Sequence, residues 1–414
     1  MLTKNFILTS LSSLFWYISS RADLLYLLPF LIYQITESLT WVGIGGFLRL
    51  IPMIMGPLYG VAADRLNRKT LLISINTVNG LLMLVIGATV YLEIINIYIL
   101  AGLVLLTGMC YPADMITRRA FISTIVLPKY ITKGLSVDVI NFMIGSIIGP
   151  ISVGFLLTFT NVSFAYAVMG VIYFIGVCTV LFVKTKATVS SDELAPNRLA
   201  KSKLTNTTSP LSDLKSVTLY VYHHPPLMAA LVIVIIANVS IISYQAMISS
   251  IGTTELDLST NRAGFLVSAV YFGGIFGGIA VFFNKNIQYH ARYMLLGILL
   301  MGIGGLGLGM LSSYSAILAF LVLGGIGIGI FGGTEFAFFV VSAPPAMAGR
   351  VFGLLVLTIS SWPVGIFLLG LIGNASSLQT AVTTTSLAGL VAIVMVVLLN
   401  RGLLGKTVPA SRNS

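Results

Sequence analysis

Apolar stretches long enough to cross a membrane recur along the whole chain and are separated by short polar turns. They lie near residues 6–33, 41–63, 71–92, 97–117, 136–160 and 164–183, and, after a polar stretch, near 227–249, 263–283, 292–311, 314–341, 351–373 and 378–400. Each is about as long as a helix that spans a bilayer. The pattern predicts an all-α integral membrane protein with twelve transmembrane helices in two six-helix bundles.

The polar stretch in the middle of the chain divides the predicted bundles. It is rich in Ser, Thr, Asn and Lys, a composition typical of a solvated connector that holds no folded domain. We expect an N-terminal bundle at 1–183, a cytoplasmic linker at 184–224, a C-terminal bundle at 225–400 and a cytoplasmic tail at 401–414.

Composition supports the same class. Of the 414 residues, 57% are apolar and 8% are charged, whereas a soluble globular protein has about 25% charged residues. The net charge of +11 would suit a nucleic-acid binder if the basic residues formed a patch on a folded surface. All Lys and Arg residues except Arg21, Arg49 and Arg262 instead fall in the loops, flanks and termini of one side. This positive-inside asymmetry predicts a multi-pass protein of the cell membrane with both termini cytoplasmic, membrane lipid around it and no nucleic-acid partner.

The residues that usually bind metals or cofactors are scarce. Cys110 and Cys178 lie in apolar segments, and the three histidines lie in polar loops without metal-ligand spacing. The letters G-x-G-x-x-G at 302–307 fall inside a predicted membrane helix, with no strand before them, so we interpret them as helix packing. We expect no enzyme, no cofactor and no metal site, and no direct use of ATP, because a Walker motif is absent.

The loop between the second and third predicted helices carries a cluster of charges. It reads Gly60-Val-Ala-Ala-Asp64-Arg65-Leu-Asn67-Arg68-Lys69. Gly60 and Asp64 are one turn apart on one helix face, so a second helix could approach at the glycine while the charges form a latch. An ordinary basic flank with one paired Asp is the alternative.

This loop resembles the inner-loop signature G-x-x-x-D-R-x-G-R-[RK] of the major facilitator superfamily, with Asn67 in place of the second glycine. Arg49-x-x-Pro52, Gly56-Pro57 and the later Gly349-Arg350-Val-Phe-Gly run resemble its enterobactin-exporter-like and macrolide-efflux-like branch. The resemblance implies the major facilitator fold, and a loop that holds the outward-facing state together at the cytoplasmic side. The candidate gating residues are Gly60, Asp64, Arg65, Arg68, Lys69, Asp114, Arg118, Arg119, Asp138 and Arg350.

The fifth predicted helix contains a second match. Gly145-Ser-Ile-Ile-Gly149-Pro150-Ile-Ser-Val-Gly154 resembles the antiporter motif G-x-x-x-G-P-x-x-G-G, which the family associates with export. Gly145 and Gly149 form a small face that permits close helix contact, and Pro150 weakens the helix. Plain helix packing is the alternative.

Charges inside the membrane form the third candidate feature. Inserting a charged side chain at the bilayer centre costs at least about 2.5–3.5 kcal/mol of free energy, so a charge at that depth indicates a specific role. We hypothesise that Asp23 in the first helix carries a proton and that Arg21 or Arg49 tunes it. A static ion pair between helices 1 and 2 is the alternative. Arg21 and Asp23 are two residues apart, so they face different sides of the helix and should not pair directly.

Polar and aromatic residues in the middle of the predicted helices are candidates for a substrate cavity at the midplane between the bundles. They are Tyr17, Tyr26, Asn141, Asn238, Tyr244, Gln245, Tyr271, Glu335 and Trp362. Glu335 could recognise a cation, carry a second proton, or be a hydrogen-bonded structural acid.

Together these features predict a secondary transporter that works by alternating access. We expect a proton-coupled exporter, an antiporter, of a siderophore or drug-like small molecule, with protons as the coupling ion. Two alternatives stay open: an importer or uniporter of a small nutrient on the same fold, and a membrane sensor or scaffold that does not transport.

Overall fold

The computed structural model describes residues 3–127, 130–184, 217–283, 289–343 and 347–405. Within these ranges the chain is helical and contains no strand. The prediction of an all-helical membrane protein is therefore confirmed.

Six helical segments form the first half of the chain. The last four are continuous helices, and the first two are each divided into shorter pieces. The segments are α1 (Lys4–Ala22), η1 (Asp23–Leu27) and α2 (Leu28–Thr36); α3 (Leu39–Leu50), η2 (Ile51–Met55) and α4 (Gly56–Arg65); α5 (Arg68–Tyr91); α6 (Ile97–Ile125); α7 (Ile131–Phe159); and α8 (Val162–Leu181).

The second half repeats this arrangement. Its segments are α11 (Pro225–Ile236), η4 (Ala237–Ile241), η5 (Ile242–Ala246) and α12 (Ile248–Thr254); α13 (Thr260–Phe283); α14 (His290–Met310); α15 (Tyr314–Ser342); α16 (Ala348–Ile359) and α17 (Trp362–Ala375); and α18 (Leu378–Leu399), followed by the short η6 (Arg401–Leu404). Within the described residues, ten segments are long and apolar enough to cross a membrane. The other two are the first and second, which are interrupted and carry buried charges.

Local sequence explains where several helices begin. Asn67, Asn96 and Asn161 precede α5, α6 and α8, and each side-chain oxygen accepts hydrogen bonds from backbone N–H groups two or three residues later. Such caps satisfy donors that the first helical turn leaves without partners. Most of the predicted linker lies outside the described residues; residues 217–222 are helical, and Val217 and Val221 pack in the apolar cluster of the second half.

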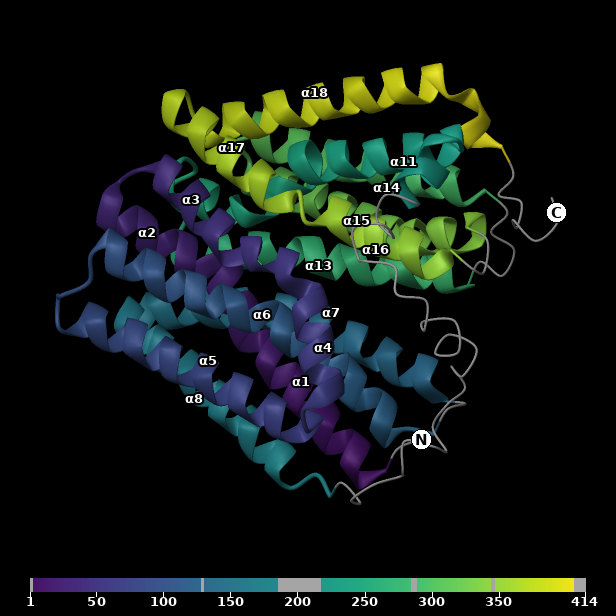
Figure 1. The fold of residues 1–414 in the computed structure, drawn as a ribbon. Coiled ribbons are helices and arrows are strands. Elements are labelled where there is room, and N and C mark those ends of the chain that lie inside the picture. The colour runs from purple at the N-terminus through teal and green to yellow at the C-terminus, as the bar shows by residue number, and fades with distance from the viewer. Residues whose placement is uncertain (1–2, 128–129, 185–216, 284–288, 344–346, 406–414) are drawn as a thin grey trace.

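The two halves form two bundles that meet along one seam (Figure 1). At one end α3 packs closely against α17: a Cβ added to Gly43 would lie 3.1 Å from the Ile366 and Phe367 carbonyl oxygens. In the middle α7 packs along α13, where the Ser268 hydroxyl donates a 2.7 Å hydrogen bond to the Ile147 carbonyl. Helix 1 joins the seam through the Leu25 carbonyl, which accepts a 2.8 Å bond from the Ser249 hydroxyl.

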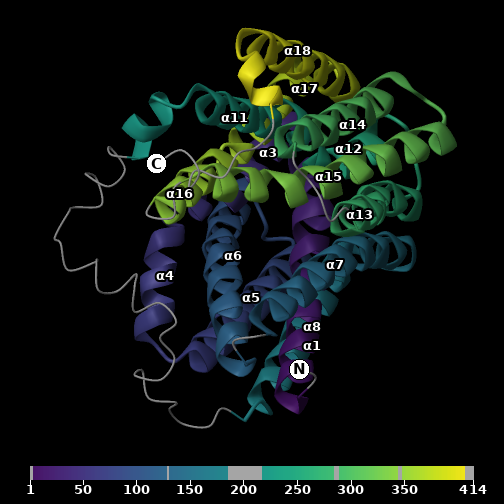
Figure 2. The same ribbon diagram turned by 90° about the vertical axis from the view of Figure 1, so that its right-hand side faces the viewer.

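The opposite end of the molecule is built differently. The half-helices α4 and α16 pack mainly on neighbours of their own bundle, α4 on α6 and α16 on α15 and α11. Figure 2, viewed from this end, shows α4 among the helices of the first bundle and α16 with those of the second. The bundles are thus joined at the end of α2, α3 and α17 and are much less joined at the end where α1 begins and α18 ends (Figure 1).

Glycine-to-backbone contacts hold α13 and α15 together. A Cβ added to Gly325 would overlap the Val270 carbonyl oxygen, and one added to Gly277 would overlap the Ile326 carbonyl oxygen. The glycines at 302–307 also face helices: Gly304 approaches Gly324 and Gly302 approaches Leu390. Small residues let membrane helices approach closely enough for dispersion contacts to hold them, since lipid supplies no hydrophobic drive. The prediction that the 302–307 run serves packing agrees with these contacts.

We predict that Gly325→Ala destabilises the protein, because the backbone of α13 or α15 must move to admit the methyl group. Overpacking of this kind costs about 1–3 kcal/mol. Thermal unfolding of the purified protein in detergent measures the loss as a lower melting temperature. Gly278→Ala on α13 is the matched control, because no atom of the part of the chain that the structure describes lies within 4 Å of its added Cβ. Equal melting temperatures for the two variants would contradict the packing argument.

The orientation of the chain in the membrane is open to a direct test. We expect both termini on the cytoplasmic side, because the basic flanks gather at the end where α1 begins and α18 ends. A fluorescent protein fused after Ser414 should fluoresce in bacteria, and alkaline phosphatase fused after Glu93 should be active. The reverse pattern would show that the orientation is inverted.

Candidate functional site

The interior of the first bundle contains an unusual number of charged side chains. Arg21, Asp23, Arg49, Asp114 and Arg118 are each at most 2% exposed. A buried charge is tolerated only when partners compensate for the water that it loses. The partners of these groups therefore define the candidate site.

Asp23 pairs with Arg49 from the second segment. The Arg49 Nε donates to Asp23 Oδ2 at 3.2 Å, and the Tyr166 hydroxyl donates to Asp23 Oδ1 at 3.4 Å. Arg49 Nη1 also donates to the Thr107 carbonyl at 2.9 Å. Two of the three predicted coupling residues are thus in contact, within a network that connects η1, α3, α6 and α8.

Asp23 also begins a distortion of helix 1. The segment η1 is a π-helix, in which the Leu28 N–H bonds to the Asp23 carbonyl five residues before it. The first segment of the second half has a π-helix of the same length, η4, with the Ile242 N–H bonded to the Ala237 carbonyl. Single π-turns inside α-helices often mark functional positions. Sequence reasoning missed both, because no residue pattern distinguishes them from the surrounding helix.

Arg21 faces away from Asp23, as their spacing predicts. Its Nε donates to the Ser146 hydroxyl of α7 at 3.0 Å, and its Nη2 donates to the Tyr271 hydroxyl of α13. The guanidinium carbon lies 4.8 Å from the ring centroid of Phe142 and 5.1 Å from that of Tyr271. Arg49, and not Arg21, is therefore the arginine bonded to Asp23, and Arg21 connects the two bundles.

Asp114 and Arg118 form a second ion pair inside α6. The contact is bidentate: Arg118 Nε donates to Asp114 Oδ2 and Arg118 Nη2 donates to Asp114 Oδ1, both at 2.8 Å. Asn76 donates to Asp114 at 2.7 Å, and Arg118 donates to the Ser12 hydroxyl at 3.2 Å. All these partners belong to the first bundle. In this structure the pair does not link two bundles, in contrast to the latch expected of gating residues.

Asp138 forms the third pair, on α7. The Tyr17 hydroxyl donates to Asp138 Oδ2 at 3.0 Å, and Arg119 Nε lies 3.6 Å from the same oxygen. The Arg119 side chain is 50% exposed, whereas that of Asp138 is 1% exposed. This pair is therefore the one with a partner in reach of water.

The inner-loop motif is described only in part. The side chains of Asp64 and Arg350 lie outside the described residues. Arg68 donates to the Ala120 carbonyl at 2.9 Å, and Lys69 donates to the Val183 carbonyl at 2.8 Å, just beyond α8. These bonds lie within the first bundle, and the Arg65 side chain is exposed.

Gly60 departs from its prediction. An added Cβ there would have no neighbour within 4 Å among the described residues, so none of the described helices packs on it. The reason is the position of α4 at the end of the molecule where the two bundles are least joined.

The glycines of the antiporter-like motif are closely packed. A Cβ added to Gly145 would lie 2.5 Å from the Tyr17 Cβ, and one added to Gly149 would lie 2.6 Å from the Ile18 carbonyl oxygen. On the other side of α7, Gly154 meets the Thr260 carbonyl and the Pro150 carbonyl faces Gly264. The helix is continuous through Pro150. Helix α7 therefore fits against helix 1 of its own bundle and α13 of the other.

Several of the predicted cavity residues make hydrogen bonds to other helices or within their own helix. Tyr26 donates to the Thr260 carbonyl at 2.6 Å, Asn141 to the Ser10 carbonyl at 3.0 Å, and Asn238 to the Val234 carbonyl of its own helix at 2.9 Å. Tyr271 donates to Gln245 Oε1 at 3.1 Å. Many of these side chains are used in helix contacts, and their role in a shared substrate cavity stays a prediction.

Three of the predicted cavity residues carry buried polar atoms without a hydrogen-bond partner among the described residues. These atoms are Tyr244 OH, Trp362 Nε1 and Glu335 Oε1. Glu335 is 3% exposed. The described residues supply no hydrogen bond to Oε1, and the three interpretations of Glu335 stay open.

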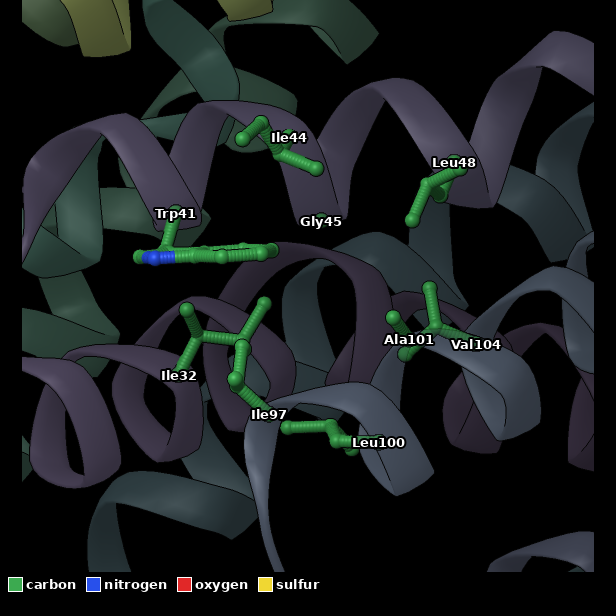
Figure 3. Close-up of a pocket in the computed structure, with 9 residues that line it drawn as sticks. All are labelled: Ile32, Trp41, Ile44, Gly45, Leu48, Ile97, Leu100, Ala101 and Val104. Carbon is green, nitrogen blue, oxygen red and sulfur yellow. The ribbon is translucent and has the colours of Figure 1, made fainter.

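A pocket between α3, α2 and α6 contains none of the predicted site residues (Figure 3). Its lining is apolar except for the indole nitrogen of Trp41; the residues are Ile32, Trp41, Ile44, Gly45, Leu48, Ile97, Leu100, Ala101 and Val104. A second small cavity is lined in part by Asp138 and Asn141. The charged networks, and not the Figure 3 pocket, form the candidate site.

Residues that sequence reasoning did not identify complete these networks. Ser146 and Phe142 contact Arg21, and Tyr166 contacts Asp23. Ser12, Ser13 and Asn76 were visible as polar residues inside apolar segments, which is a usable signal. The carbonyl of Thr107 left no signal, because every residue has one.

Comparison with solved structures shows the same architecture. A bacterial homologue of the human lysosomal transporter Spinster, in an inward-facing and unoccupied conformation, has a TM-score of 0.65 and 13% identity over 98% of this chain and 97% of that chain. The nucleoside transporter NupG has a TM-score of 0.72 and 11% identity over 96% and 99% of the two chains. The peptide transporter POT in complex with sulfate has a TM-score of 0.67 and 15% identity over 97% and 94%. At these identities the likeness shows the fold alone.

A comparison with curated proteins found no match. The family model described as Major Facilitator Superfamily matches residues 6–368, which is most of the chain. This chain therefore belongs to the major facilitator superfamily of secondary transporters, which are not enzymes.

Proposed function

We propose that this transporter is a proton-coupled exporter of a siderophore-like or drug-like small molecule. The observation that carries the proposal is the Asp23–Arg49 pair, buried beside a π-helix at mid-depth of the first bundle. Protonation of Asp23 would cancel its attraction for Arg49, which would then keep only its bond to the Thr107 carbonyl. A proton can thereby change how helices 1 and 2 fit together, which is what coupling requires.

The site also lies close to the seam along which the bundles must move. Helix 1 carries Asp23 on one face and Arg21, bonded to α13, on another. A shift of helix 1 would therefore either move α13 or break its hydrogen bond with Arg21. With cytoplasmic termini, as we propose, the contact of α3 with α17 joins the bundles on the outer side, and the less joined end faces the cytoplasm.

Export as the direction rests on α7. Its antiporter-like glycines fit helix 1 on one side and α13 on the other, so the motif forms part of the moving seam. Import, uniport and a non-transporting sensor are the alternatives, and they differ in the direction or presence of substrate movement.

We further propose that charges near the cytoplasmic end gate this movement. The Asp138–Arg119 pair is suited to breaking and re-forming, because half-exposed Arg119 can exchange its partner for water. The Asp114–Arg118 pair of α6 is fully buried and is bonded to α1 and α5, so it would hold the first bundle together during the movement.

The coupling proposal predicts that Asp23→Asn abolishes transport driven by a pH gradient. Purified protein in sealed proteoliposomes would be tested with ethidium, rhodamine 6G and fluorescein as fluorescent probes of different charge. The unaltered protein should move at least one probe against its gradient when a pH difference is imposed, and Asp23→Asn should not.

Asp257→Asn is the matched control for this experiment. It makes the same chemical change at an exposed loop position whose positive φ of 48° Asn tolerates well. Undiminished gradient-driven transport by Asp23→Asn, or no gradient-driven movement of any probe by the parent, would contradict proton-coupled export.

The two cytoplasmic-side acids should differ in stability. Asp114→Asn leaves Arg118 buried without its counter-ion, which costs about 3–5 kcal/mol. Asp138→Asn leaves Arg119 able to reach water, so its loss should be about 1 kcal/mol or less. Melting temperatures of the two variants in detergent compare them directly, and equal losses would contradict the assignment of one pair to structure and the other to gating.

A further inference from the structure

Arg21 is the buried arginine of the first bundle that has no carboxylate partner. Arg49 is bonded to Asp23 and Arg118 to Asp114, whereas no carboxylate among the described residues lies within salt-bridge distance of Arg21. Its side chain is nevertheless 2% exposed. A cation kept away from water normally needs a negative charge or several hydrogen bonds in return.

The hydrogen bonds of Arg21 are incomplete as well. A guanidinium carries five N–H donors. Within the described part of the chain, one bonds to the Ser146 hydroxyl and one to the Tyr271 hydroxyl. Both acceptors are neutral, and the remaining donors have no acceptor among the described residues.

The surroundings of Arg21 combine aromatic rings with a polar edge. Phe142 and Tyr271 lie near the guanidinium, and their own ring centroids are 6.2 Å apart at an interplanar angle of 84°. Tyr17 makes a similar edge-to-face contact with Phe142 at 5.4 Å. Gln245 accepts a hydrogen bond from Tyr271. These rings offer contacts to an apolar or aromatic body of a ligand whose anionic group binds the guanidinium.

The position of Arg21 suits a group that binds cargo. It comes from helix 1 of the first bundle, and its partner Tyr271 comes from α13 of the second. Transporters of this architecture bind substrate near the midplane between their repeats. An anion that displaced the Tyr271 hydroxyl would also break this bond between the bundles, so binding and movement would be linked at one atom pair.

We infer that Arg21 binds an anionic group, such as a carboxylate or sulfonate, on the transported molecule, whose body is aromatic or apolar. The inference rests on the proposed transport function and adds the substrate class. A planar, bidentate anion is the natural ligand of a guanidinium fork. The competing interpretation is that Arg21 only holds the bundles together through Tyr271.

Three probes with one body and different charges test the inference. They are 4-(1-naphthyl)butyrate, 4-(1-naphthyl)butanol and 4-(1-naphthyl)butylamine, and microscale thermophoresis measures their binding to the purified full-length protein in detergent. The parent protein should bind the carboxylate at least about tenfold more tightly than the alcohol or the amine, which is the effect of one charge-assisted contact.

Variants decide between the two interpretations. Arg21→Gln should lose the preference for the anion, and so should Arg21→Met, which removes the same charge and packs between the rings if the Gln variant does not fold. Tyr271→Phe keeps the ring and removes only the hydrogen bond from Arg21 to the Tyr271 hydroxyl and the bond from that hydroxyl to Gln245, so it should retain the preference. Arg262→Gln removes an exposed arginine at the other end of the protein and should also retain it.

Several results would overturn the inference. These are equal binding of the three probes by the parent, an unchanged preference after Arg21 is replaced, and a loss in Tyr271→Phe as large as that in Arg21→Gln. The last would mean that Arg21 acts through the contact between the bundles. Failure of this binding test leaves the Asp23 transport test unaffected, so the two proposals can fail separately.

Discussion

The cost of placing charge in an apolar interior is the constraint on which the rest of this structure depends. Each buried acid of the first bundle is bonded to an arginine, and the Asp23, Asp114 and Asp138 pairs together involve α1, α3, α5, α6, α7 and α8. Removing one member of such a pair leaves its partner uncompensated, so the pairs fix how the helices stand relative to one another. Arg21 satisfies the same constraint differently, with two hydroxyls and two aromatic rings.

The two bundles are held together by a different kind of contact. Glycines allow α3 to meet α17 and α7 to meet α13 at backbone distance, and the polar bonds across the seam go mostly to carbonyl groups. Such contacts are short and numerous at one end and sparse at the other. Because no acid–base pair among the described residues crosses the seam, separating the bundles breaks no buried ion pair. Arg21, which is bonded across the seam, would lose its Tyr271 bond and keep its Ser146 bond. This makes a rocking movement energetically plausible for this chain.

Much of the fold could be predicted from sequence. Whether the partner of a site residue could be predicted depended on how many residues separate the two in the chain. The twelve segments follow from apolar length, and the opposite directions of Arg21 and Asp23 follow from helix geometry. Asp114 and Arg118 are four residues apart on one helix, so their pairing could have been predicted from spacing instead of the latch that was expected. The choice of Arg49 as the partner of Asp23, 26 residues away, could not. The neighbours of Gly60 and of the cavity residues could not be predicted for a related reason, since they depend on which conformation the bundles adopt.

The sequence by itself determined what is local: the membrane class, the helical segments, their caps and the predicted orientation. These depend on hydropathy summed over about 20 residues, on the residue before each helix and on loop charge. The tertiary structure decided which buried charges compensate one another, where the first segment of each half becomes a π-helix, and that Arg21 faces the second bundle. Those outcomes depend on which helices are neighbours, because a buried charge is stabilised only by groups within a few ångströms of it, whatever their distance in sequence.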